Sequence, residues 1–518
     1  MNKLSINYLI SDKKIILTIK NIEIIYKITF ISTFIWGIFA HGVALFNKYS
    51  FYDDIGNIYD GIGSTISSGR WLLAFFHFLK LRFNFYYSIP AFYGFLVIFL
   101  IAVINVLLVY SFSIKNAYFC VFLSGLTICF PTVCSMFFYI FTAFYYVIGI
   151  FMSIFGAWLL CRNKHWYTRV IAVILMGSSL GIYQANAGIY ISFILLYMIK
   201  DTYENQRDMK SFCKYTLQYI FCIICSLLFY FTVNKVVLNI TNTTLTKYKG
   251  IANVDNIPLT DYLYRIAYAY KLFIFPNYHT ESIYPNKSIF IYWLILCITV
   301  ILTLVLIIKK WKENKLYAIE LLLLTSFVPL VINFAYVITE AGDVYALMQY
   351  SHIFLYVYFS WLVTRNDIDI DGKYVIRTVA TICIFLLAFI YCRNDNTRYL
   401  NAELKQQRAI SYITTLVANI KATENYKDEY PVTFVNSENM HDLSFHERDD
   451  INCITYIPDS WNIVSGTSWI EFAKVWTGYN PVVLEENKFK DLPEVKNMPY
   501  YPDDGSIKVI DKTVVVKF

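Results

Sequence analysis

The stretch FISTFIWGIFAHGVALFNKYSFYDDIG, residues 30–56, contains the two features that decide the fold of this chain. Its first part is a long apolar run, and its end carries two adjacent carboxylates, Asp53 and Asp54. A helix needs about 20 apolar residues to cross the hydrocarbon core of a bilayer. We therefore predict a membrane-spanning helix over 28–46, followed by an acidic loop at the membrane edge.

The composition of the whole chain supports a membrane protein. Of its 518 residues, 57% are hydrophobic and only 16% are charged, whereas soluble domains carry about 25% charged residues. The net charge of +7 would fit a nucleic-acid partner. However, the basic residues lie in loops between apolar runs rather than on one face, so we exclude nucleic acid and expect lipid around the chain.

Eleven apolar segments have the length or pattern of membrane helices. We expect mainly α structure, because backbone groups in lipid must find their hydrogen bonds within the segment. The weakest pair flanks the polar break at 181–186, and these two segments could also form one long helix. The predicted spans are 28–46, 90–113, 117–134, 137–160, 169–182, 187–200, 215–237, 288–308, 316–338, 345–363 and 376–392.

Loop charges set the predicted orientation. Basic loops precede the first span and recur near 115, 162–169, 200–214, 309–315 and 365–377, whereas the short loops 135–136, 183–186 and 339–344 hold no Lys or Arg. Positively charged loops stay in the cytoplasm. The alternation holds only if 169–200 crosses twice, so we expect eleven spans with the N-terminus inside and the C-terminus outside.

Two domains follow from this topology. Residues 1–392 form the membrane domain, with outer loops 47–89 and 238–287. Within the first loop, 64–81 has an apolar stripe typical of a helix lying on the membrane. Residues 393–518 form a small α/β domain outside, with a helix over 394–421 and short β-like runs at 431–435, 453–457 and 506–518, the last a hairpin.

The candidate site residues lie on the predicted outer side, and each has two interpretations. Asp53 and Asp54 either cap the next helix, or one is a general base that the other orients. Arg70 either anchors a helix at the interface or binds a phosphate. Tyr183 and Gln184 either satisfy the backbone at the break or form hydrogen bonds with sugar hydroxyls or the donor phosphate. Glu340 and Asp343 form a solvated loop or complete the acidic side of one cavity.

The order of several short patterns resembles the Gtr type of glucosyltransferase, a bacterial and phage-encoded family that modifies O-antigen and converts serotype. The patterns are Asp53-Asp54, Gly69-Arg70, Ser179-Leu180-Gly181-Ile182-Tyr183-Gln184-Ala185, and in the tail 396–408 and 498–507 leading into Val514-Val515-Val516-Lys517. The resemblance spans nearly the whole chain.

This resemblance implies a GT-C-like polytopic glycosyltransferase of the bacterial inner membrane. Such enzymes move a sugar, here glucose, from a polyprenyl-phosphate carrier to a lipid-linked or surface polysaccharide such as the O-antigen of lipopolysaccharide, on the periplasmic face. An acidic residue of the first outer loop is their usual base, which points to Asp53 or Asp54. An outer-mouth arginine expected around 340–350 does not occur in the sequence, so Arg70 is left to bind the donor phosphate. No cofactor is implied, and a divalent cation at the Asp pair is left open.

Two other functions, an O-antigen polymerase and a flippase, fit the sequence less well than this transferase. An O-antigen polymerase would rely on arginines in two large outer loops rather than on an acidic pair. A flippase of lipid-linked sugars would carry charges within its spans and repeat-related halves, but the span interiors here are nearly free of charge. A nucleotide-sugar donor is disfavoured, because the Asp pair lies on the predicted outer side and no DxD motif occurs in a cytoplasmic domain.

Overall fold

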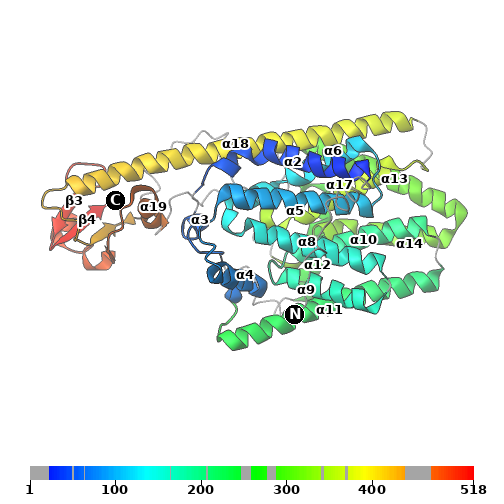
Figure 1. Ribbon diagram of the computed structural model, residues 1–518, viewed down its shortest axis with the longest axis horizontal. Coiled ribbons are helices and arrows are strands. Elements are labelled where there is room, and N and C mark those ends of the chain that lie inside the picture. Colours follow the sequence, from blue (N-terminus) through cyan, green and yellow to red (C-terminus); the bar gives the residue numbers. More distant parts are fainter. Residues whose placement is uncertain are drawn as a thin grey trace, which may run out of the picture.

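The computed structural model describes residues 23–49, 52–63, 65–163, 165–205, 208–246, 258–276, 288–339, 344–367, 372–437 and 468–518. The elements are helical except for one small sheet near the C-terminus (Figure 1). The helices are α2 (Ile24–Phe46), α3 (Tyr52–Ile55), η1 (Ile66–Ser68), α4 (Trp71–Arg82), α5 (Pro90–Ser111), α6 (Ala117–Ile128), α7 (Pro131–Phe138), α8 (Ile140–Arg162), α9 (Trp166–Leu180), α10 (Asn186–Glu204), α11 (Met209–Thr241), α12 (Leu259–Ile274), α13 (Ile289–Glu313), α14 (Lys315–Ser326), α15 (Val328–Ile332), α16 (Ala335–Ile338), η7 (Ala346–Met348), η8 (Tyr350–His352), α17 (Ile353–Thr364), α18 (Lys373–Ala422), α19 (Ser468–Thr477), η11 (Glu486–Lys488) and α20 (Pro493–Lys496).

Most of the predicted spans coincide with long apolar helices. In the described part of the chain, eight helices are long and apolar enough to cross a membrane: α2, α5, α6 with α7, α8, α11, α13, α14 with α15, and α18. The other three predicted spans correspond to α9, α10 and the segment from η7 to α17, which are shorter or less apolar. The chain is therefore a mainly α membrane protein, and the number of eleven spans stays a prediction.

The weak pair of spans forms a hairpin, not one long helix. From its start near the end of α8, α9 runs antiparallel to that helix, and the Ser153 hydroxyl donates a hydrogen bond to the Ser179 hydroxyl at 2.8 Å. After the turn at 181–185, α10 returns along α8, so that Tyr197 lines the same hollow as Arg162 at the end of α8. The polar turn is enclosed by protein, as irregular backbone in a membrane requires.

Helix α18 is continuous across the domain boundary that we predicted at 393. It has 50 residues, which corresponds to a length of about 75 Å. Figure 1 shows α18 running along the bundle and continuing beyond it to the small sheet. The sequence predicted its two parts, 376–392 and 394–421, but not their continuity. The division into two domains at this position stays a prediction.

The C-terminal sheet has the strand order β2-β1-β4-β3, with β1 at Val432–Val435, β2 at Val483–Leu484, β3 at Ile507–Ile510 and β4 at Thr513–Lys517. Strand β1 is parallel to both of its neighbours, whereas β3 and β4 form the predicted antiparallel hairpin. Its turn residues, Asp511 and Lys512, both have positive φ angles, as two-residue hairpin turns require. The predicted run at 453–457 lies outside the described residues.

The segment predicted as the first outer loop lies at the end of the bundle that faces the sheet, where Figure 1 shows α3 and α4. Its predicted helix over 64–81 is wrong at its start, because the chain forms η1, breaks at Gly69 and begins α4 only at Trp71. The break arises because Gly69 has a φ of 72°, in the left-handed region that ends a helix. Helix α3, which carries the Asp pair, packs against α19 of the C-terminal region.

Candidate functional site

The structure places Asp53 and Asp54 in different environments. Both belong to the short helix α3, but the Asp54 side chain is fully buried, whereas Asp53 is partly exposed. The carboxylate of Asp54 forms an ion pair with the ammonium group of Lys48. Its other oxygen, Oδ1, has no hydrogen-bond partner among the described residues. Asp54 therefore holds one paired and one unpaired carboxylate oxygen.

Burial and the ion pair with Lys48 act in opposite directions on the pKa of Asp54. Burial raises this pKa, because removal from water penalises the charged carboxylate, and the negative charge of Asp53 raises it further. The ion pair with Lys48 lowers the pKa of Asp54, but the effect of burial is larger. An aspartate whose pKa lies above its ordinary value is suited to accept a proton near neutral pH.

Sequence reasoning missed Lys48, which is held in place from two sides. Its ammonium group donates to the carbonyl oxygen of Tyr49 at 3.0 Å, and its own carbonyl oxygen accepts a hydrogen bond from Gln406 of α18 at 2.7 Å. The ring of Tyr49 stacks on that of Tyr399, also on α18, with ring centroids 6.1 Å apart. A lysine six residues before an aspartate matches no recognisable motif, so the pairing of Lys48 with Asp54 could not be predicted from the sequence.

Arg70 lies against two tyrosines at the same end of the bundle. It precedes the first residue of α4, and one of its terminal nitrogens donates to the Tyr146 hydroxyl at 3.1 Å. The guanidinium group lies over the ring of Tyr183, 5.0 Å from the ring centroid. The two tyrosine rings are stacked, with centroids 4.9 Å apart and planes 13° from parallel. The rings thus form a π-rich floor that holds the cation in place.

Gln184 and the turn around it bind the segment that carries Arg70. The Gln184 amide donates to the carbonyl oxygen of Ser68 at 2.7 Å and to the Tyr230 hydroxyl at 3.1 Å. That hydroxyl donates in turn to the carbonyl oxygen of Gly69 at 3.1 Å. The backbone N–H of Leu72 donates to the carbonyl oxygen of Gly181 at 2.9 Å. Two predicted patterns that lie more than 100 residues apart therefore form one structural unit.

Glu340 and Asp343 lie outside the described residues. Tyr345 follows that loop and lies close to Tyr183, within range of electrostatic interaction with its hydroxyl. Just beyond it, the carbonyl oxygen of Ala346 accepts a hydrogen bond from Thr132 of α7 at 2.6 Å. Tyr345, a described residue after these positions, therefore lies beside Tyr183, over which Arg70 is placed.

The residues around Asp54 and those around Arg70 contact two consecutive helices, α7 and α8. Tyr49, next to Lys48, packs on Phe138 at the end of α7, with ring centroids 5.9 Å apart. Arg70 contacts Tyr146 on the following helix, α8. The structure thus brings five predicted residues, Asp53, Asp54, Arg70, Tyr183 and Gln184, to the same end of the molecule, and it adds Lys48, Tyr146 and Tyr230.

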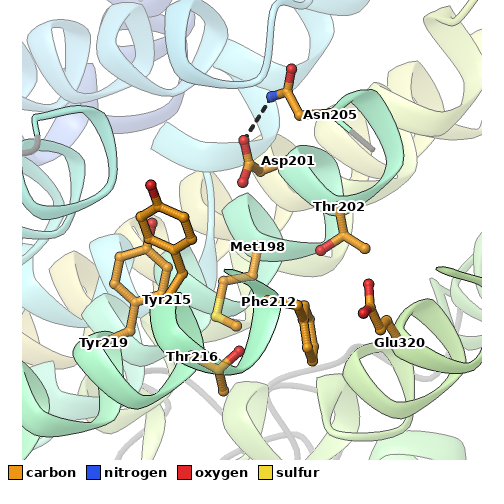
Figure 2. Close-up of a pocket in the computed structure, with 9 residues that line it drawn as sticks. All are labelled: Met198, Asp201, Thr202, Asn205, Phe212, Tyr215, Thr216, Tyr219 and Glu320. Atoms are coloured by element: carbon orange, nitrogen blue, oxygen red, sulfur yellow. Dashed lines mark hydrogen bonds between the residues drawn. The ribbon is translucent and has the colours of Figure 1, made fainter. Parts of the chain in front are cut away.

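A cavity between α10, α11 and α14 lies away from these residues. Figure 2 shows its lining, in which Asp201 accepts a hydrogen bond from Asn205 at 2.8 Å and Glu320 contributes a second carboxylate. Its volume is about 20 Å³, which holds about one water molecule. The cavity is too small for a sugar, and no predicted site residue lines it.

Eight helices of the described part of the chain are long and apolar enough to cross a membrane, which defines a mainly α membrane protein. Residues 42–356 match the family model described as Glucosyl transferase GtrII. The match covers more than half of the chain and includes every predicted site residue, so the chain belongs to the GtrII glucosyl transferase family. The resemblance found in the sequence is confirmed, and the chain is a glycosyltransferase. Comparison with curated proteins finds no match, and comparison with solved structures finds none.

Proposed function

We propose that this glucosyl transferase moves glucose from a polyprenyl-phosphate carrier to O-antigen or a related surface polysaccharide. The reaction takes place on the periplasmic face of the bacterial inner membrane. The observation that carries the proposal is the position of Arg70, a partly exposed cation fixed over Tyr146 and Tyr183 at one end of an apolar bundle. A lipid-linked donor presents its phosphate at this depth, where the membrane ends.

Arg70 is suited to bind the phosphate of such a donor. Its guanidinium group keeps its charge at all accessible pH values and matches phosphate oxygens with paired N–H donors. The carrier leaves as polyprenyl phosphate, so negative charge grows on this phosphate as the bond to the sugar breaks. A fixed cation stabilises that developing charge without reorganisation.

Asp54 is the proposed general base. In the transfer step the acceptor hydroxyl must reach Oδ1 of Asp54, which protein covers in this structure. Oδ1 then accepts the hydroxyl proton while the hydroxyl oxygen attacks C1 of glucose. The bond between C1 and the phosphate oxygen breaks, and its electron pair leaves with the carrier phosphate. The ion pair with Lys48 lowers the pKa of the buried carboxylate against the effect of burial and so favours the ionised form, which accepts a proton. Asp53, which is partly exposed, orients α3 or contacts the acceptor.

A donor assay tests this proposal directly. Purified full-length protein in lipid nanodiscs is given radiolabelled polyprenyl-phosphate-glucose and a lipid-linked polysaccharide acceptor. We expect label in the polysaccharide from this donor and none from a nucleotide-glucose. Transfer from the nucleotide sugar alone would refute the donor assignment. Increased polymer length without glucosylation would point to the alternative of a polymerase, and movement of lipid-linked sugar without transfer would point to a flippase.

The predicted face is tested separately. A reporter that is active only outside the cytoplasm, fused after Phe518, should be active, and the same reporter fused after Lys312 should be inactive. The reverse pattern would place Asp54 and Arg70 in the cytoplasm and would remove the argument for a lipid-phosphate donor.

A further inference from the structure

A polar hollow lies at the end of the bundle opposite Asp54. Its volume is about 280 Å³, and it is formed by the start of α2, the ends of α5 and α8, and α10. Helix α2 separates it from the Asp54 loop, because Tyr26 at one end of α2 lines the hollow while Lys48 follows the other end. The 23 residues of α2 span about 34 Å, so the two sites are distinct.

Three cations line this hollow and outnumber its one carboxylate. They are Lys115, Arg162 and Lys200, and the carboxylate is Glu23. Lys200 is buried, and its ammonium group donates to the carbonyl oxygen of Ser111 and to the Ser113 hydroxyl, both at 2.8 Å. Its charge is balanced by Glu204, a carboxylate oxygen of which lies 3.9 Å away, so Lys115 and Arg162 carry the free positive charge of the hollow. Within the described ranges, no carboxylate oxygen lies within 4 Å of the charged nitrogens of Lys115 or Arg162.

Aromatic rings fix the orientation of the central cation. The guanidinium group of Arg162 lies 4.8 Å from the ring centroid of Tyr110 and 5.5 Å from that of Trp158. Contacts with ring faces hold the guanidinium while its N–H groups stay available to an anion. Tyr and Trp side chains are also typical of the membrane–water interface, because their rings are amphipathic. A ligand bound at that level has an apolar part in the membrane and a charged part in water.

We propose that this hollow binds the phosphate of an anionic phospholipid headgroup. Arg162 and Lys115 bind the phosphate oxygens, and the rings of Tyr110 and Trp158 pack against the glycerol region. Lys200, paired with Glu204, holds Ser111 and Ser113 at the inner side of the hollow. Basic pockets between membrane helices are known to bind anionic headgroups. This site does not use Asp54 or Arg70 and stands independently of the proposed reaction.

The test compares two double variants that lose the same charge at the same end of the bundle. The first removes Arg162 and Lys115 (Arg162→Ala with Lys115→Ala), and the control removes two exposed lysines outside the hollow (Lys210→Ala with Lys312→Ala). Binding of phosphatidylglycerol and of phosphatidylcholine to the full-length protein is measured in a neutral detergent by native mass spectrometry. We expect the wild type and the control to prefer phosphatidylglycerol by about tenfold or more, and the first variant to lose that preference.

Equal loss in the control, or a preference retained in the first variant, would overturn the proposal. A third arm adds millimolar inorganic phosphate to the wild type. Complete displacement of phosphatidylglycerol by phosphate would assign the site to the free ion and would also overturn it. If the double variant fails to elute as a single species, the single variant Lys115→Glu, at an exposed position, gives the same comparison.

Discussion

Lys48 forms an ion pair with Asp54, and the side chain of this aspartate is fully buried within the segment that follows α2. A buried charge without a partner is costly, so the pair with Lys48 favours the ionised form of Asp54 against the effect of burial. This relationship separates the two neighbouring aspartates chemically and is the basis of the first two predictions.

Replacement of Asp54 should reduce activity far more than replacement of Asp53. Asp54→Asn removes the proton acceptor, and loss of a general base typically lowers a rate by about 10²–10⁴-fold. Asp53→Asn should cost less than about tenfold, because that side chain is partly exposed and is not the buried partner of Lys48. The measurement is kcat/KM for glucose transfer, at matched protein levels in the membrane. Full activity of the Asp54 variant would exclude it as the base.

Replacement of Lys48 should move the pH dependence of the reaction. Lys48 lowers the pKa of Asp54 against the effect of burial, so Lys48→Met should raise that pKa. A base works only while deprotonated, and the acidic limb of the kcat profile should therefore shift to higher pH. Lys48→Arg keeps the charge and should leave the limb near its original place. A uniform loss of activity at every pH, without a shift of the limb, would contradict this role.

Replacement of Arg70 should weaken the donor interaction. A hydrogen bond to a charged group contributes about 1.5–3 kcal/mol, so Arg70→Ala should reduce kcat/KM for the donor by about 10–100-fold. Tyr146→Phe serves as the matched control, because it removes only the hydroxyl that accepts from Arg70 at 3.1 Å and keeps the ring. The Tyr146 variant should lose much less. Equal kinetics for Arg70→Ala and the wild type with the lipid donor would remove Arg70 from the site.

Replacement of Gly69 should destabilise the site without touching a charged group. A Cβ atom at this position would lie 2.6 Å from the Tyr230 hydroxyl and 3.0 Å from the Gln184 amide, on a backbone with a φ of 72°. Left-handed backbone alone costs about 1–2 kcal/mol for a residue with a side chain. Gly69→Ala should therefore lower Tm by a few degrees. Gly56→Ala in the same loop has no atom within 4 Å of its Cβ and should leave Tm unchanged.

The membrane helices could be predicted from the sequence because lipid imposes one solution on a long apolar run. The predicted segments at 28–46 and 90–113 coincide closely with α2 and α5. The hairpin β3–β4 was also predictable, because a run of valines beside a polar turn has few alternatives. In these places local pattern and tertiary structure agree.

The site was only partly predictable, because its contacts join distant segments. Gln184 binds the carbonyl oxygen of Ser68, and no property of either residue alone predicts that pairing. Lys48 resembles any loop lysine until Gln406 of α18 is seen to hold its backbone. The continuity of α18 was missed because Arg393 and Asp395 interrupt the apolar pattern, although the helix carries them without a break.

The unbroken α18 connects the sheet to the candidate site through one continuous helix. Gln406 touches the Lys48 segment partway along this helix, and the sheet follows its end. The rotational position of the sheet about the helix axis is therefore set by the number of residues that follow Gln406 in the helix. One inserted residue would turn the sheet by about 100°, whereas seven would nearly restore its direction. When C-terminal regions are exchanged between members of this family, the number of helical residues between Gln406 and the sheet should therefore be kept, or changed by seven.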